Sequence, residues 1–171
     1  SAFSTVVTLE LLDVDLDQIK EHTELATAAS NALVGAAAGA VRDMAGVPNT
    51  VAVSSPIQVT SFTPDTTPPA LVSAVVDMNT LTAHLRFSET VNASSLAVTR
   101  IIIQAASAVS SGDSLVRLTG GSVSADDSTL VNISLNRVDS NDLKFNADLA
   151  TSEADTFIML LSDAVADMNQ N

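Results

Sequence analysis

The chain has 171 residues, 46% of them hydrophobic and only 3% aromatic, and its formal net charge is −13 at pH 7. This charge excludes nucleic acid and anionic membrane faces as partners and favours cations, while the alternative is that it only keeps the protein soluble. The absence of cysteine excludes disulfides, thiolate zinc sites and cysteine nucleophiles.

Strand patterns dominate the first part of the chain, and a single short helix interrupts them. The strands are predicted at residues 5–11, 32–41 and 50–62, the last bent at Pro56. Between the first two, residues 13–20 predict a short helical turn that is capped by Asp15, with Gln18 three residues later. A turn is expected at residues 43–46.

A proline-rich stretch at residues 64–69 follows, and it predicts a stiff, extended linker because each proline fixes φ and removes a backbone donor. Strand patterns then recur at roughly ten-residue spacing, which is typical of an antiparallel sandwich. They cover residues 71–76 and 80–87 as a hairpin, 101–104, 114–118 before a Gly120-Gly121 turn, 130–135 and 156–161. In 130–135, the inward phase is Val131, Ile133 and Leu135.

The two halves share short sequences at one constant offset of 124 residues, the distance from Ser4 to Ser128. The matching pairs are residues 4–7 and 128–131, 25–27 and 149–151, and 40–44 and 164–168. We therefore predict residues 1–63 as the C-terminal part of one repeat, 64–69 as a linker, and 70–171 as most of the next repeat without its last strand. Two explanations of the missing strand stay open: a longer polypeptide continues the array, or a neighbouring chain donates the strand.

Three segments carry a family resemblance: DTTPPALVS at 65–73, LRFSETVNASSL at 85–96 and DMAG at 43–46. They resemble the bacterial-type immunoglobulin-like (Ig-like) repeats of surface-layer proteins and giant adhesins, and similar repeats in very long surface proteins of marine microbes and algae. The resemblance implies an all-β fold of tandem Ig-like sandwiches, an extracellular location and structural or adhesive roles. The chain departs from it at Gln170, where the first copy has Gly46.

Acidic residues are expected to converge on the linker. In a seven-strand sandwich, Glu89 at the end of the second strand and Asp167 before the last strand lie at the end that faces Asp65. Asp13 and Asp15 approach from the preceding repeat. Carboxylate oxygens suit calcium, so we predict an interdomain calcium site, with plain solvated turn caps as the alternative.

Asp13 and Asp15, together with three further acidic residues, also fall on the ligand positions of an EF-hand loop. The sharp-turn glycine of that loop is replaced by Gln18, so the run is better explained as an acidic helix N-terminus, which the helix dipole favours. Asn92 and Asn132 begin the triplets Asn-Ala-Ser and Asn-Ile-Ser, and both are candidate N-glycosylation sites that we expect to be accessible.

No nucleophile elbow, metalloprotease pair or phosphate-binding glycine loop is present in the sequence, so we do not predict an enzyme. The leading hypothesis is a structural component of an extracellular filament, stalk or surface appendage, whose partners are neighbouring repeats or identical chains. The alternative is an adhesin or a module that binds carbohydrate or cell surfaces. The scarcity of aromatic rings argues against a sugar-binding face.

Overall fold

The computed structural model describes residues 5–50, 56–108, 112 and 114–171. Within them it has nine strands in three sheets and two α-helices, so the all-β class is confirmed at this level. The chain divides into two compact units, Ser1–Thr66 and Thr67–Asn171, and each is described by itself. No helix in the described residues is both long and apolar enough to span a bilayer.

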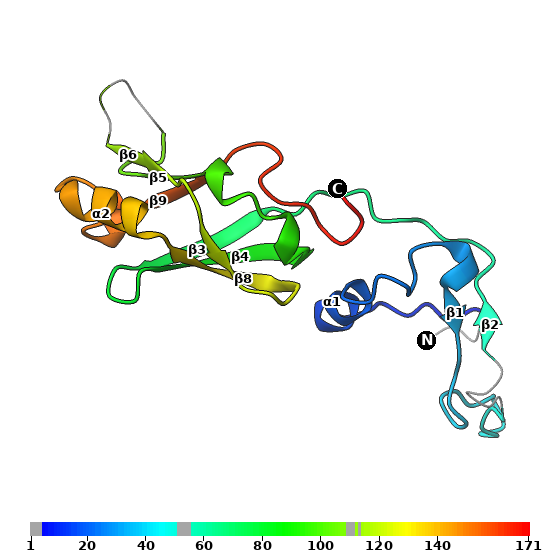
Figure 1. Ribbon diagram of the computed structural model, residues 1–171. Helices are drawn as coiled ribbons and strands as arrows, with labels where there is room; N and C mark the ends of the chain where they lie inside the picture. Colours follow the sequence, from blue (N-terminus) through cyan, green and yellow to red (C-terminus); the bar gives the residue numbers. More distant parts are fainter. Residues whose placement is uncertain (1–4, 51–55, 109–111, 113) are drawn as a thin grey trace. The chain divides into compact units, whose positions relative to one another are not determined.

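The C-terminal unit is a pair of antiparallel sheets stacked face to face (Figure 1). The first sheet has the order β3-β4-β8-β7, with β3 at Leu71–Asp77, β4 at Thr82–Val91, β7 at Gly121–Val123 and β8 at Ser128–Leu135. The second has the order β6-β5-β9, with β5 at Ile101–Gln104, β6 at Leu115–Arg117 and β9 at Phe157–Leu160.

The core of this unit lies between the two sheets. Leu85 and Ile133 from the first sheet and Ile101 and Ile103 from the second are all fully buried. The alternation of β8 places Val131, Ile133 and Leu135 inward, as the sequence pattern predicts. Fully buried apolar side chains of this size each contribute roughly 1.5–3 kcal/mol, which explains why this unit folds around them.

Helix α2 (Arg137–Phe145) connects β8 to the segment before β9 and buries Leu143. Asn136 caps its N-terminus, because its side chain accepts the backbone N–H of Asp139 at 2.8 Å. Three short 3₁₀ turns complete the unit: η2 (Ala93–Ser95), η3 (Val98–Arg100) and η4 (Glu153–Asp155).

The N-terminal unit has little regular structure. It contains helix α1 (Asp13–Lys20), the 3₁₀ turn η1 (Ala29–Asn31) and two strands, β1 (Leu33–Val34) and β2 (Ile57–Gln58). The strands pair antiparallel, with Leu33 opposite Gln58 and Val34 opposite Ile57. Among its described residues only Ala32 is buried, so this unit lacks a core of its own.

Several predictions for this unit are wrong. Residues 5–11 form no strand, residues 32–41 contribute only β1, and residues 50–62 contribute only β2, with residues 51–55 outside the described part. Helix α1 does form, but it begins at Asp13 and its N-cap is Leu12, so Asp15 lies inside the helix and does not cap it. An exposed alternating pattern gains too little burial to hold a strand, and this explains the shortfall.

In the C-terminal unit the predicted strands are present, with two differences. Strand β4 extends to Val91, so Glu89 lies within it and does not close it. Gly121 does not complete a turn but begins β7, a strand that the sequence did not predict. A Cβ on Gly121 would lie 2.7 Å from the carbonyl oxygen of Ser134, so only glycine permits this close strand approach.

Two turns occur in both units at the offset of 124 residues. Ala26 and Ala150 both have positive φ, at 51° and 58°, and Gly46 and Gln170 do so at 81° and 71°. In the first turn the backbone N–H of residue 26 or 150 bonds to the carbonyl oxygen five residues later, at 3.4 and 3.3 Å. The two units therefore share backbone conformations even where their residues differ, as at Gly46 and Gln170.

Candidate metal centre

Glu89 and Asp167 lie at one end of the C-terminal unit and are both buried, with 8% and 1% of their surface exposed. Glu89 is held by strand β4, and Asp167 by the loop after β9, which bridges back to β4 at Val91. The backbone N–H of Asn92 donates to the carbonyl oxygen of Ala166 at 3.0 Å and reinforces this bridge.

The Asp167 carboxylate organises its own turn. Its Oδ1 accepts the backbone N–H groups of Asn169 and Asn171 at 2.9 and 2.8 Å, and its Oδ2 accepts the side-chain amide of Asn171 at 3.1 Å. Asp43, at the equivalent position of the N-terminal unit, accepts two backbone N–H groups in the same way, both at 2.8 Å. Turn capping is therefore a role of this aspartate in both units.

Asp65 precedes β3 on the proline-rich stretch. One carboxylate oxygen each from Asp65, Glu89 and Asp167 lies within 4.8 Å of the others. Three carboxylates this close repel one another unless positive charge offsets them. One such charge is the Lys20 ammonium, whose Nζ lies 2.6 Å from Oδ2 of Asp65, with both side chains 23% exposed.

The set of oxygen donors fits a hard cation such as calcium or magnesium. Three carboxylates supply fewer than the six to eight ligands that calcium takes, so backbone carbonyls or water would complete the sphere.

The contribution of Asp13 and Asp15 to a calcium site stays a prediction. Both lie exposed in the first turn of α1, where their charge complements the helix dipole. At the offset of 124 residues, Asp13 corresponds to Arg137. The positive charge of an arginine would repel a cation, so a cation site at this position is not shared by the two units.

The counterpart of Asp15 is Asp139, a fully buried carboxylate that the sequence did not single out. Asp139 accepts the backbone N–H and the hydroxyl of Thr119 at 2.9 and 2.8 Å, and the side-chain amide of Asn136 at 3.0 Å. It thereby fastens α2 to the segment before β7. The recurrence of aspartate at positions 15 and 139 was the available signal.

The candidate glycosylation residues are both half-buried. Asn92 lies in a loop and accepts the backbone N–H of Ser94 at 3.0 Å. Asn132 lies in the middle of β8, and its Oδ1 is 2.6 Å from Nδ1 of His84 on the neighbouring strand. Asn92 is therefore the better placed of the two, and glycosylation of either stays a prediction.

Searches for similar proteins found no matching family model, no matching curated protein and no matching solved structure.

Proposed function

We propose that the chain is a structural segment of an extracellular filament, stalk or surface appendage built from tandem Ig-like domains. The strand order supports an Ig-like arrangement: β3-β4-β8-β7 corresponds to strands A, B, E and D. Strands β5 and β9 correspond to C and F, with β6 as an additional neighbour of C.

The observation that supports the tandem arrangement is that the two turns and several helices and strands recur at the same offset in the sequence. Helices α1 and α2, the 3₁₀ turns η1 and η4, and strands β1 and β9 all begin 124 residues apart. Such a repeat builds an elongated array, in which each domain resists extension through its strand ladders and proline-rich linkers set the spacing.

An adhesin or carbohydrate-binding module is the second candidate, since the same array can project a distant tip. The scarcity of aromatic residues in the sequence does not favour a sugar-binding face on these repeats.

Imaging of the native assembly by electron microscopy tests the proposal. Subunits that repeat at a fixed rise along a filament are the expected result. Isolated monomeric rods on a cell surface favour the adhesin stalk, and a compact, non-repeating particle overturns both candidates.

The acidic cluster adds a second proposal: calcium bound by Asp65, Glu89 and Asp167 anchors the proline-rich stretch to the end of β4. The support is the proximity of three oxygen donors, two of them buried. Calcium titration by calorimetry, with thermal unfolding followed by circular dichroism, tests this proposal. A calcium concentration 100 times the Kd stabilises the folded state by about 2.7 kcal/mol.

Glu89→Gln removes one ligand charge and keeps the side-chain shape, so it should weaken calcium binding at least roughly tenfold. Glu153→Gln, at an exposed position outside the cluster, is the matched control and should bind as the native chain does. Lys20→Met removes the competing ammonium and should tighten binding. The calcium proposal fails if millimolar calcium releases no heat and leaves the melting temperature unchanged in every variant.

A further inference from the structure

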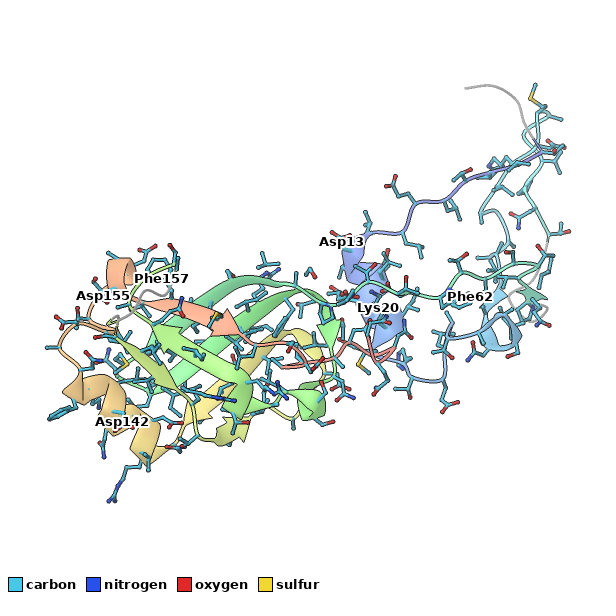
Figure 2. The ribbon with its side chains drawn as sticks, turned by 90° about the horizontal axis from the view of Figure 1, so that it is seen from above. Asp13, Lys20, Phe62, Asp142, Asp155 and Phe157 are labelled. Atoms are coloured by element: carbon cyan, nitrogen blue, oxygen red, sulfur yellow. The ribbon has the colours of Figure 1, made fainter. Side chains whose placement is uncertain are left out.

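Helix α2 and strand β6 line a groove on the C-terminal unit, with a volume of about 520 Å³. Leu115 and Arg117 of β6 are both exposed and lie two residues apart, so they point to the same side of the strand. Asp142 (labelled in Figure 2) and Phe145 are three residues apart on α2 and share one face of the helix, and Asn146 follows as its C-cap. Two elements therefore bring five side chains to one groove, whose volume falls in the range of small-ligand sites, about 300–1,000 Å³.

Phe145 supplies an apolar surface to this groove. Its surface is 94% exposed, and no other aromatic residue in the described part of the chain is exposed. Leu143, two residues earlier on the same helix, is fully buried, so the packing of α2 on the sheets does not require Phe145. A ring in this position presents a flat, rigid face that a ligand can cover at little cost in conformational entropy, because few side-chain torsions are fixed.

Three polar side chains in the same groove have unused hydrogen-bonding capacity. Within the described residues, the carboxylate of Asp142 accepts no hydrogen bond and forms no ion pair. Arg117 uses only its Nε, which donates to the carbonyl oxygen of Thr99 at 2.7 Å, so in this part of the chain its two terminal nitrogens have no partner. The Oδ1 of Asn146 accepts the backbone N–H of Asp148 at 3.2 Å, and its amide hydrogens have no described acceptor. The groove therefore offers both donors and acceptors beside an apolar ring.

The two charges in the groove select against charged ligands. Arg117 repels a cation and Asp142 repels an anion, whereas a neutral ligand with hydroxyl groups can accept from the guanidinium and donate to the carboxylate. Hydrogen bonds to such charged groups are stronger than those between neutral groups. A pyranose sugar combines hydroxyl groups with an apolar face of C–H groups, and that face packs on an aromatic ring.

We propose that this groove binds a neutral sugar residue of a glycan, which stacks on Phe145 and forms hydrogen bonds with Arg117, Asp142 and Asn146. The scarcity of aromatic residues in the sequence does not favour a broad sugar-binding face, but a site for one sugar needs only one ring. The inference rests on the second candidate function, to which it gives a site, and it does not depend on filament assembly or on calcium.

The N-terminal unit shows that a continuing chain leaves the equivalent helix face open. At the offset of 124 residues, Asp142, Phe145 and Asn146 correspond to Gln18, Glu21 and His22, and these three are all exposed. The chain continues from that unit through the proline-rich stretch, where Asp65 pairs with Lys20 on α1. Because Glu21 stands where the C-terminal unit has Phe145, the ring belongs to this unit and is not a general feature of the repeat.

Nuclear magnetic resonance titration of the isotope-labelled chain tests the site. The probes are the methyl glycosides of glucose, galactose, mannose and N-acetylglucosamine, which are neutral and differ in the orientation of their hydroxyl groups. At least one of them should shift the backbone amide signals of residues 115–117 and 142–146. The expected dissociation constant is on the order of 1 mM, because an exposed groove covers few atoms of a single sugar.

Two results of this titration would overturn the proposal. One is that none of the four glycosides shifts any signal at concentrations well above the millimolar range, and the other is that the shifts fall outside residues 115–117 and 142–146. Either result leaves the filament hypothesis standing, because electron microscopy of the native assembly tests that hypothesis separately.

Substitutions of Phe145 test the stacking on its ring. Phe145→Leu keeps an apolar side chain but removes the ring, so it should weaken binding of the glycoside at least roughly tenfold. Phe145→Trp keeps a ring and should bind at least as tightly as the native chain, within about twofold. Val138→Ala is the matched control, since Val138 is exposed on the same helix and does not line the groove, and it should bind as the native chain does. Unchanged binding by Phe145→Leu, or equal losses in Phe145→Leu and Val138→Ala, contradicts the proposal.

Discussion

Residues 5–11 and 128–135 have the same alternating pattern, but only residues 128–135 form a strand. In the C-terminal unit, β8 lies between β4 and β7, and Ile133 is fully buried. In the N-terminal unit the equivalent residue, Leu9, is 80% exposed, and no strand forms over residues 5–11. The comparison shows that alternation provides a face for burial, while neighbouring strands decide whether the segment becomes a strand.

Truncation of the equivalent core positions should have very different costs. Ile133→Ala removes a fully buried side chain between the two sheets and should lower the free energy of unfolding by about 2–5 kcal/mol. Leu9→Ala should change it by less than about 0.5 kcal/mol, because the side chain is already exposed. Urea unfolding followed by far-ultraviolet circular dichroism measures both values. Equal losses would mean that residues 5–11 are packed in solution as β8 is.

The two equivalent aspartates should differ in the same sense. Asp139→Ala leaves the donors of Thr119 and Asn136 without their buried acceptor and should cost about 2–3 kcal/mol. Asp15→Ala, at an exposed helical position, should cost less than about 0.5 kcal/mol. The same denaturant titration measures the pair. If Asp15→Ala were the more damaging, the α1 carboxylate would have a role that the N-terminal unit does not show.

Strands with a local signal in the sequence were predicted correctly. The hairpin of β3 and β4, the buried strand β5 and the inward phase of β8 follow from apolar alternation and turn residues close in sequence. The strand predicted at residues 5–11 is absent, because exposure there depends on partner strands that no local pattern encodes. Strand β7 was not predicted, since Gly120-Gly121 indicates a turn unless the close approach to Ser134 is known.

In the candidate metal centre, too, some features follow from the sequence and others depend on contacts between distant residues. Strand direction alone brought Asp65, Glu89 and Asp167 to one place, because the ends of antiparallel strands alternate predictably. The contribution of Asp13 and Asp15 depends on how one repeat packs on the next, which side-chain contacts across a linker decide, and it stays a prediction. Asp139 was missed because its partner Thr119 lies 20 residues earlier in the chain, outside the helix that holds Asp139 and its N-cap Asn136.

Exchange of residues 46 and 170 sharpens the comparison of the two turns. Both positions have φ in the left-handed region, which costs a residue with a side chain about 1–2 kcal/mol and glycine almost nothing. Gln170→Gly should therefore raise the free energy of unfolding by about 1 kcal/mol, and Gly46→Gln should lower the stability of its turn by a similar amount. A Cβ at Gly46 meets nothing within 4 Å, so its penalty is purely conformational. Thermal unfolding measures the stability gained in Gln170→Gly, and amide hydrogen exchange of Val47 measures the stability lost by the turn in Gly46→Gln. No change in either quantity would contradict the strain at Gln170.

The smallest expected effect separates the two 3₁₀ turns by pH. Asp155 and Asn31 are equivalent, and each Oδ1 accepts two backbone N–H groups, at 2.9 and 2.8 Å for Asp155 and at 3.0 and 2.8 Å for Asn31. The hydroxyl of Thr151 donates to Oδ2 of Asp155, and this bond, together with the backbone N–H of Ser152, lowers the pKa of Asp155 from 3.8 to about 2. Asparagine does not titrate, so the turn at Asn31 has no such dependence. Figure 2 shows Asp155 near Phe157, at the start of β9, where loosening of the turn would be transmitted to the strand.

Because the folded-state pKa of Asp155 is lowered, its contribution to stability is complete above about pH 4 and is lost as the pH falls toward 2. The melting temperature of the native chain should therefore decline more steeply over this window than that of Asp155→Asn, and the two should run parallel above it. Asn31→Asp is the reciprocal test: Thr27 now accepts the Asn31 amide at 2.7 Å, and its hydroxyl can rotate to donate to a carboxylate. That variant should give residue 31 a carboxyl pKa below its usual range, measurable by nuclear magnetic resonance. A pKa near the ordinary value in Asn31→Asp would show that the turn of the C-terminal unit, and not the shared set of hydrogen bonds, determines the titration of Asp155.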